Sequence, residues 1–152
     1  MLYVECYPDE LLARTLGVTR RTVRHEHGKG NIVNRLRRLQ AGTGLMDEDP
    51  TGSQPDELRH YQEVERVGNL ILLEHATEAG KRVILISPRL EEWLYERAGV
   101  HRLSPNDYGL PDSPDRLHSI PRYDQKRSFV EFLNRLRELD SDMQQLRRWV
   151  SL

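Results

Sequence analysis

Three acidic side chains stand where the chain leaves short apolar runs. Glu5 lies near the end of the run over residues 2–6, and Asp47 and Asp49 follow the run over 43–46. Because side chains two residues apart in extended chain point to the same side, Asp47 and Asp49 can reach one ion. An oxygen-only set suits a hard cation such as Mg²⁺ or Mn²⁺ rather than zinc. Such a cation polarises phosphoryl oxygens, so the pattern predicts phosphodiester chemistry.

A plainer interpretation of the same residues stays open. The segment Asp-Glu-Asp over 47–49 precedes Pro-Thr-Gly over 50–52, which is typical of a solvated turn, and Glu5 could be a surface residue. Spacing alone does not choose between the two. If the carboxylates do gather, their mutual repulsion favours a divalent cation among them.

A glycine-rich turn supplies a candidate phosphate contact. Gly28-Lys29-Gly30-Asn31 resembles an anion-binding turn at a helix N-terminus, where free N–H groups face the ligand. It is not a Walker motif, and a turn with an ordinary helix cap explains it equally well. We predict that Lys29 lies on the same rim as Glu5 and steadies a scissile phosphate.

Other polar groups have simpler explanations. His25-Glu26-His27 could offer two imidazoles to a metal, but a zinc site needs three or four ligands and Cys6 is the only thiol, so a polar strand is favoured. One basic set could track a nucleic-acid backbone, although a solvated helix face is the commoner explanation. It comprises Arg35, Arg37 and Arg38.

The elements that carry these residues follow from apolar periodicity and turn residues. After the first apolar run, helical spacing continues to Leu16, where Gly17 ends the helix. A second helix begins after Gly28. We predict strands over 2–6 and 43–46 and a short strand or an extended arm over 21–27. A short helix over 57–67, a hairpin of 69–74 with 82–86, and a helix capped by Ser87-Pro88 that runs to about Gly99 complete the prediction.

The alternation of strands and helices indicates an α/β fold with a mostly parallel sheet flanked by helices. In such sheets the site lies beyond the carboxyl ends of the strands, which places Glu5 with Asp47 and Asp49 on one rim. A C-terminal helical extension is predicted from the helical spacing of apolar residues after residue 125. We divide the chain into a core over 1–99, a proline-rich loop or lid over 100–124 with a short helix near 114–118, and C-terminal helices over 125–152 that pack on the core or on a partner.

Length and composition limit the function classes. At 152 residues the chain fits one domain, and 23 basic against 24 acidic residues argue against a general nucleic-acid coat protein. The single cysteine excludes an internal disulfide. With no long apolar run and no leader-like start, we expect a soluble, cytoplasmic protein that does not contact membranes.

The acidic residues also resemble a known family. In the Toprim domain of topoisomerases, bacterial primases and overcoming-lysogenization-defect nucleases, a first strand ends in Glu, usually followed by Gly and by an acid four positions after the Glu. Here Val4-Glu5 and Asp9 match, and Cys6 replaces the Gly. A later strand of the family ends in Asp-x-Asp, matched by Asp47-Glu48-Asp49. The resemblance covers roughly residues 1–99 and implies a Toprim-like, Rossmann-like sheet.

The resemblance implies roles for these residues. Glu5, Asp47 and Asp49, with Asp9, would bind Mg²⁺ or Mn²⁺, and Glu5 would also take part in proton transfer. The segment over 88–93 is similar to the Pro-x-x-Glu-x-Trp segment of small Toprim-like proteins from bacterial defence loci. That similarity brings either Glu91 or Glu92 to the site, whereas a helix face with a core tryptophan explains the segment more simply.

The predicted function is a Mg²⁺-dependent Toprim nuclease. With Glu5, Asp47, Asp49 and Lys29 as catalytic residues, it would cleave DNA or RNA, tRNA included, as the effector of an anti-phage defence or toxin-like system. A partner ATPase could activate it, and a homo-oligomer is one expected assembly. The alternative is a non-catalytic assembly or regulatory subunit that docks through its C-terminal helices. A small-molecule phosphotransfer enzyme is a third reading, disfavoured because no nucleotide-specific motif is present.

Overall fold

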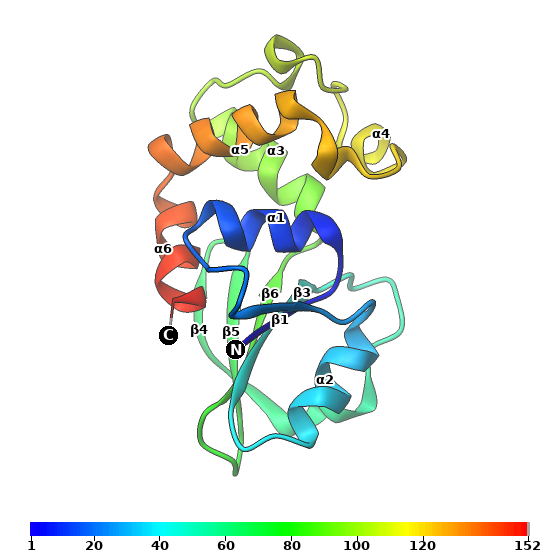
Figure 1. Ribbon diagram of the computed structural model, residues 1–152, viewed down its shortest axis with the longest axis vertical. Coiled ribbons are helices and arrows are strands. Elements are labelled where there is room, and N and C mark those ends of the chain that lie inside the picture. Colours follow the sequence, from blue (N-terminus) through cyan, green and yellow to red (C-terminus); the bar gives the residue numbers. More distant parts are fainter. Residues whose placement is uncertain (152) are drawn as a thin grey trace.

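One mixed sheet organises the computed structural model, which describes residues 1–151 (Figure 1). Its strand order is β2-β1-β3-β6-β5-β4, with the first four strands parallel, β5 antiparallel to β6, and β4 antiparallel to β5. This arrangement confirms the predicted α/β class. The strands are β1 (Leu2–Val4), β2 (Val23–His25), β3 (Gly42–Asp47), β4 (Tyr61–Val67), β5 (Leu70–His75) and β6 (Lys81–Ile86).

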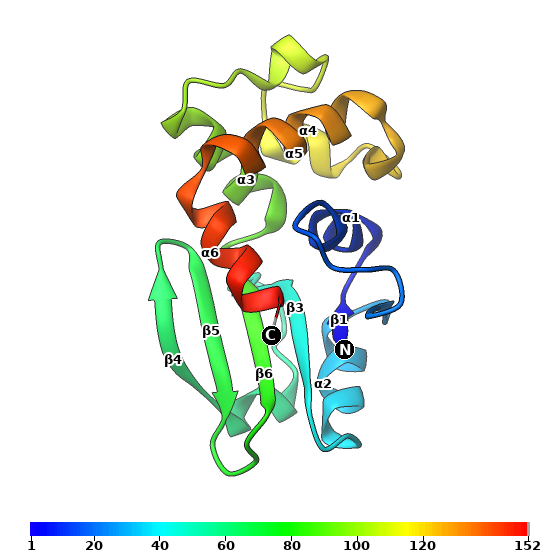
Figure 2. The same cartoon turned by 60° about the vertical axis from the view of Figure 1, so that its left-hand side comes forward.

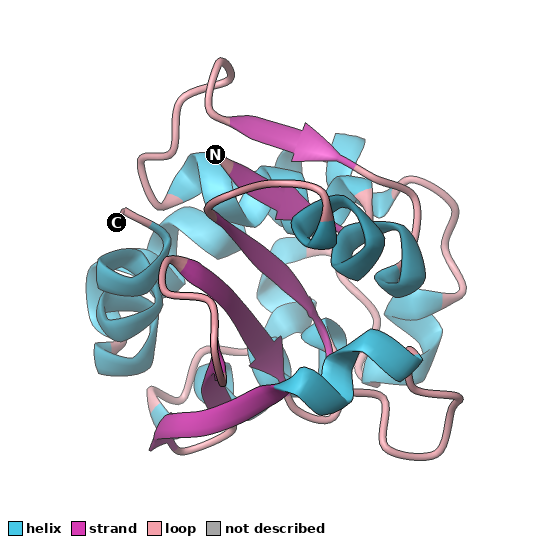
Figure 3. Ribbon diagram, turned by 90° about the horizontal axis from the view of Figure 1, so that it is seen from below, coloured by secondary structure: helices cyan, strands magenta, loops and turns pink. Residues whose placement is uncertain are grey.

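Helices cover both faces of this sheet, which twists as it crosses the molecule (Figures 2 and 3). Helix α2 packs on one face, and the other helices lie on the opposite face or above its edge. The helices are α1 (Tyr7–Thr15), α2 (Lys29–Arg37), α3 (Leu90–Val100), α4 (Pro114–His118), α5 (Arg127–Leu139) and α6 (Ser141–Val150), with short 3-10 turns η1 (Asp56–His60), η2 (Pro105–Tyr108) and η3 (Tyr123–Gln125).

The sheet has an apolar core on each side because its central strands are buried on both faces. Successive side chains of a strand point to opposite faces. Leu45 of β3 therefore joins the core beneath α1 and α3, while Met46 joins the core beneath α2. Both residues are fully buried. Covering both faces explains why the central strands read as continuous apolar runs rather than as alternating ones.

The C-terminal helices complete the larger core. Phe129, Phe132 and Leu133 of α5 are fully buried in the same cluster as Leu12 of α1 and Trp93 of α3. The apolar side of the extension over 125–152 thus packs on the core, as far as its described residues show. Within residues 1–151, every helix is too short or too polar to span a lipid bilayer.

The prediction of a helix over 57–67 is wrong. Only a single 3-10 turn forms there, and the segment continues as the edge strand β4, paired with β5 through residues such as Val67 and Leu70. Gly68, at φ +55°, and Asn69 close the hairpin between them. A Gly-Asn pair between two extended segments is a hairpin signal that was available in the sequence. Because this edge strand is exposed along nearly its whole length, its polar composition resembled a surface helix.

The predicted start of α3 is also wrong in detail. The helix begins at Leu90, with Arg89 rather than Ser87 at its N-cap. The Ser87 hydroxyl instead donates to the Glu48 carboxylate at 3.0 Å. The backbone N–H of Leu90 donates to Asp47 Oδ1 at 3.0 Å, so a side chain from β3 accepts from the first turn of α3.

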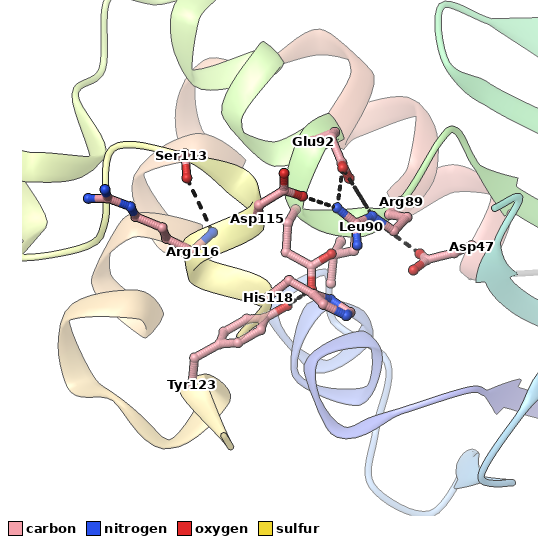
Figure 4. Close-up of polar contacts among 10 residues, drawn as sticks. Asp47, Arg89, Leu90, Glu92, Ser113, Asp115, Arg116, His118 and Tyr123 are labelled. Atoms are coloured by element: carbon pink, nitrogen blue, oxygen red, sulfur yellow. Dashed lines mark hydrogen bonds and ion pairs between the residues drawn. The ribbon is translucent and has the colours of Figure 1, made fainter. Parts of the chain in front are cut away.

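The segment over 100–124 contains the predicted short helix, α4, and is fastened to the core. Leu110, Leu117 and Tyr123 are buried within the larger core cluster. The segment is therefore an ordered crossing over the end of the sheet. Its second half brings polar side chains to the N-terminus of α3 (Figure 4).

We expect Gly44→Ala to destabilise the fold by about 1–3 kcal/mol, because the new methyl group would overpack a tight contact. A Cβ on Gly44 would lie 2.6 Å from Cγ2 of Ile32, whose branched side chain has little freedom to move. Urea unfolding measures the change. Gly30→Ala is the matched control on α2, since a Cβ there meets nothing within 4 Å. Equal stability of the two variants would contradict this account of the contact between β3 and α2.

Candidate functional site

Acidic side chains gather at the carboxyl ends of the central parallel strands. Val4 of β1 pairs with Leu45 of β3, so Glu5, which follows β1, lies beside Asp47 at the end of β3. The backbone N–H of Asp47 lies 3.4 Å from Glu5 Oε2, to which it donates. The structure thus brings together Glu5 and Asp47, two of the three residues predicted to lie on one rim.

Asp9 joins this cluster from the first turn of α1. Its exposed fraction is 1%, and within residues 1–151 neither carboxylate oxygen makes a hydrogen bond of normal geometry, although the side chain and backbone N–H of Cys6 lie close enough to lower its pKa. Burial raises the pKa of Asp9, and the nearby charge of Glu5 raises it further. A buried carboxyl group with both oxygens unsatisfied is costly, so this residue requires an explanation beyond packing.

Asp47 is held between β3 and α3. Burial raises its pKa most, followed by repulsion from Asp9, Glu5 and Glu91, while the Leu90 N–H lowers it. Glu5 behaves in the same way, because burial raises its pKa more than its hydrogen bond from the Asp47 N–H lowers it. The cluster therefore repels itself, and the native fold favours protonated forms of these groups.

Glu91 belongs to the same cluster, whereas Glu92 does not. Glu91 is buried, and its Oε1 accepts from the Tyr123 hydroxyl at 2.8 Å and lies 3.0 Å from His118 Nδ1 (Figure 4). Its Oε2 has no partner among the described residues. Glu92 pairs instead with Arg89, which also contacts Asp115 at 2.6 Å. The structure thereby distinguishes two neighbours that the sequence left equivalent.

Asp49 and Lys29 lie at the rim of the cluster. The charge of Asp49 raises the pKa of Glu5 and that of Lys29 lowers it, so both lie near this carboxylate. Lys29 Nζ donates to the Glu48 carbonyl at 3.1 Å, which ties the start of α2 to the loop after β3. Asp49 occupies the left-handed region at φ +45°, an uncommon conformation for a residue other than glycine.

His25, the last residue of β2, and the nearby His27 are not arranged as metal ligands. The rings of His25 and His27 contact each other at a tilt, with centroids 4.0 Å apart, and Nε2 of His25 faces the carbonyl of Glu5 at 3.1 Å. Of the basic helix face, Arg35 pairs with Glu26 and Arg37 with Glu57. These contacts agree with the favoured interpretations of a polar strand and a solvated helix.

Two helix N-termini face the acidic cluster. Asp9 lies in the first turn of α1 and Glu91 in the first turn of α3, where the positive end of the helix dipole favours negative charge. In the part of the chain that the structure describes, Glu5, Asp9, Asp47 and Asp49 form no ion pair. As placed, no three acidic, imidazole or thiol groups of residues 1–151 are arranged to hold a metal ion together.

Comparisons of the chain with protein-family models, with curated proteins and with solved structures gave no match.

We expect the stability of the protein in EDTA to fall as the pH rises from 5 to 8.5. The pKa values of Asp9 and Asp47 are raised in the fold. Above about pH 4 the carboxyl groups of the unfolded chain have lost their protons, whereas Asp9 and Asp47 of the native state still hold theirs. The native state therefore loses stability as the pH rises toward the raised pKa values. Urea unfolding across this range measures the slope.

Asp9→Asn should flatten that slope and raise stability at pH 8 by an amount on the order of 1–3 kcal/mol, because it removes the charge without changing shape. Asp107→Asn, at an exposed aspartate of η2, is the matched control and should leave the slope unchanged. A stability that rises with pH in the native sequence would contradict the proposed repulsion.

Tyr123→Phe should destabilise the protein by about 1–3 kcal/mol, since Glu91 would lose a buried hydrogen-bond donor. Tyr108→Phe serves as the control, because the hydroxyl of Tyr108 makes no hydrogen bond within residues 1–151. Thermal unfolding compares them. Indistinguishable melting of the two variants would show that the Tyr123 hydroxyl does not support Glu91.

Proposed function

We propose that this protein is a divalent-cation-dependent phosphodiesterase of the Toprim type that cleaves nucleic acid. The observation that carries the proposal is the carboxyl group of Asp9, which is buried beside Glu5 and Asp47 and, within residues 1–151, has no hydrogen bond of normal geometry and no contact beyond the nearby Cys6 to offset its charge. Such a group is stabilised by a cation, and a divalent cation among carboxylates is a common basis of phosphodiester hydrolysis.

The chemical type of the ligand atoms suits Mg²⁺ or Mn²⁺. Glu5, Asp9, Asp47 and Glu91 contribute carboxylate oxygens, which these hard cations prefer. Because no three groups of residues 1–151 stand ready to hold an ion, binding requires side-chain rotation, for example of the Asp47 carboxylate away from the Leu90 N–H. When bound, the cation would supply positive charge to phosphoryl oxygens and offset the repulsion within the cluster.

The protein's own groups then have separate roles. Glu5 and Asp47, with Asp49 and Asp9, would hold the cation. Glu5, whose pKa is raised from its ordinary value, is suited to accept a proton from the attacking water while the water oxygen bonds to phosphorus. Lys29 lies near Glu5 and would hold the scissile phosphate while the ester oxygen leaves.

The sheet supports the Toprim interpretation through the position of its acids. Glu5 follows β1 and Asp47 ends the adjacent parallel strand β3, as the family's pattern requires. The replacement of the usual glycine by Cys6 is compatible with this loop, because Cys6 has φ −145° and ψ 173°, a conformation open to any residue. Glu91, beside a buried Trp93, also fits the segment shared with small Toprim-like proteins.

The cellular role of this activity is a second part of the proposal. We propose a cytoplasmic effector of an anti-phage defence or toxin-like system that acts on DNA or RNA, including tRNA, and that a partner ATPase or self-association could regulate. The alternative of a non-catalytic assembly subunit finds less support. The apolar side of α5 is buried in the core through residues such as Phe129 and Phe132, so it is not free to dock a partner.

Cleavage assays test the proposal with labelled DNA and tRNA in Mg²⁺, Mn²⁺ or EDTA, with and without the product of a neighbouring gene. We expect metal-dependent cleavage that falls about a hundredfold or more in Glu5→Gln and in Asp47→Asn, because each substitution removes a ligand or a base. Calorimetry with Mn²⁺ provides a readout that does not depend on activity.

The neighbours Glu91 and Glu92 give a matched pair of variants. Glu91→Gln should weaken Mn²⁺ binding and cleavage, whereas Glu92→Gln should retain both, because Glu92 pairs with Arg89 outside the cluster. Absence of cleavage in every metal, together with absence of Mn²⁺ binding by the native sequence, would refute the proposed function.

A further inference from the structure

Helix α1 packs against α5 (Figures 1 and 2). A groove lined by arginines runs along the exposed side of α1. It consists of two adjoining hollows of about 330 and 490 Å³, which share Leu11, Arg14 and Arg20. Tyr7 and Arg122 line the hollow nearer the acidic cluster, and Arg137 lines the other. We call these two hollows together the arginine groove.

The arginine groove carries a net positive charge, since four arginines line it against the carboxylates of Glu10 and Asp124. Arg14 and Arg20 are exposed, and neither forms an ion pair with any residue of the described chain. Arg122 pairs with Asp124, so its guanidinium is held in place. Lysines are absent from the lining, and guanidinium groups suit the oxygens of phosphate better than an ammonium does.

A column of flat side chains begins at the same end of the groove. The guanidinium of Arg122 lies 3.6 Å from the ring centroid of Tyr7. Tyr7 contacts His25 edge to face at 4.3 Å, and the ring of His25 lies 4.0 Å from that of His27, with the two planes tilted by 35°. His25 also faces the carbonyl of Glu5, so the column stands directly beside the acidic cluster.

Both ends of this column are open to solvent. The Arg122 side chain is 43% exposed, and His27 is exposed as well. Both residues have left-handed backbones, at φ +49° and φ +59°, which are uncommon for side chains of this size. The fold therefore keeps two flat, cationic or aromatic groups at the surface, one at each end of the column, in conformations that cost free energy.

We propose that the arginine groove and the column bind a single strand of nucleic acid, with its phosphates on Arg14 and Arg20 and an unpaired base stacked on His27. This inference rests on the proposed function, because it names the substrate class of the same site. In a duplex the faces of each base are covered by neighbouring pairs, so flat exposed groups recognise unpaired bases. An acidic peptide could use the arginines but would gain nothing from the column.

Fluorescence anisotropy in EDTA tests this binding without cleavage, with labelled dT and rU 20-mers and a matched DNA duplex as probes. We expect Arg14→Ala/Arg20→Ala to weaken binding of a single strand. The slope of log affinity against log salt should decrease by about 1.4, which is about 0.7 for each lost phosphate contact. A preference for dT or rU would identify the strand as DNA or RNA.

His27→Asn removes the ring but keeps a residue that tolerates the left-handed region. It should weaken single-strand binding about fivefold or more and leave duplex binding unchanged. The control Arg37→Ala/Arg38→Ala makes the same change in charge on α2, across the sheet, and should bind as the native sequence does.

Three results would overturn the proposal: native affinity in Arg14→Ala/Arg20→Ala, an equal loss in the α2 control, or an equal loss of duplex binding in His27→Asn. Because no metal is present in these assays, they are separate from the test of hydrolysis. If the groove does not bind a single strand but metal-dependent cleavage is intact, only this inference is refuted. If the groove binds a single strand but the protein neither cleaves nucleic acid nor binds Mn²⁺, only the proposed function is refuted.

Discussion

Repulsion among the carboxyl groups at the end of the sheet is the constraint that the surrounding elements must accommodate. Asp9 is buried without a hydrogen bond of normal geometry among residues 1–151, and the charges of Glu5 and Glu91 raise the pKa of Asp9 and of Asp47. A core would be more stable with apolar groups at these positions. Their concentration at one point is the feature on which the proposed cation site rests.

The surrounding elements reduce this repulsion without removing it. The first turns of α1 and α3 direct their dipoles toward the cluster, and the Leu90 N–H donates to Asp47. The segment between α3 and α5 supplies the Tyr123 hydroxyl to Glu91. This segment is thus a structural support of the site as well as a connection. Lys29 adds positive charge from the start of α2.

Much of this arrangement could be predicted from the sequence, and the failures have physical causes. The parallel strands were predictable because both faces are covered and the runs are apolar, so Glu5 and Asp47 could be placed on one rim. Strand β4 was missed because edge strands carry little burial signal. The Pro-x-x-Glu-x-Trp spacing over 88–93 matches Glu91, but no local pattern encodes its contact with the hydroxyl of Tyr123, which lies 32 positions away.

The most direct test of a cation site is the anomalous diffraction of crystals grown with Mn²⁺ at pH 8. The account predicts a manganese peak among the carboxylates of Glu5, Asp9 and Asp47, with the Asp47 side chain turned away from the Leu90 N–H. A map with no manganese there at millimolar concentration, and with Asp47 still accepting from Leu90, would contradict it. The buried acids would then have to remain protonated as parts of the fold alone.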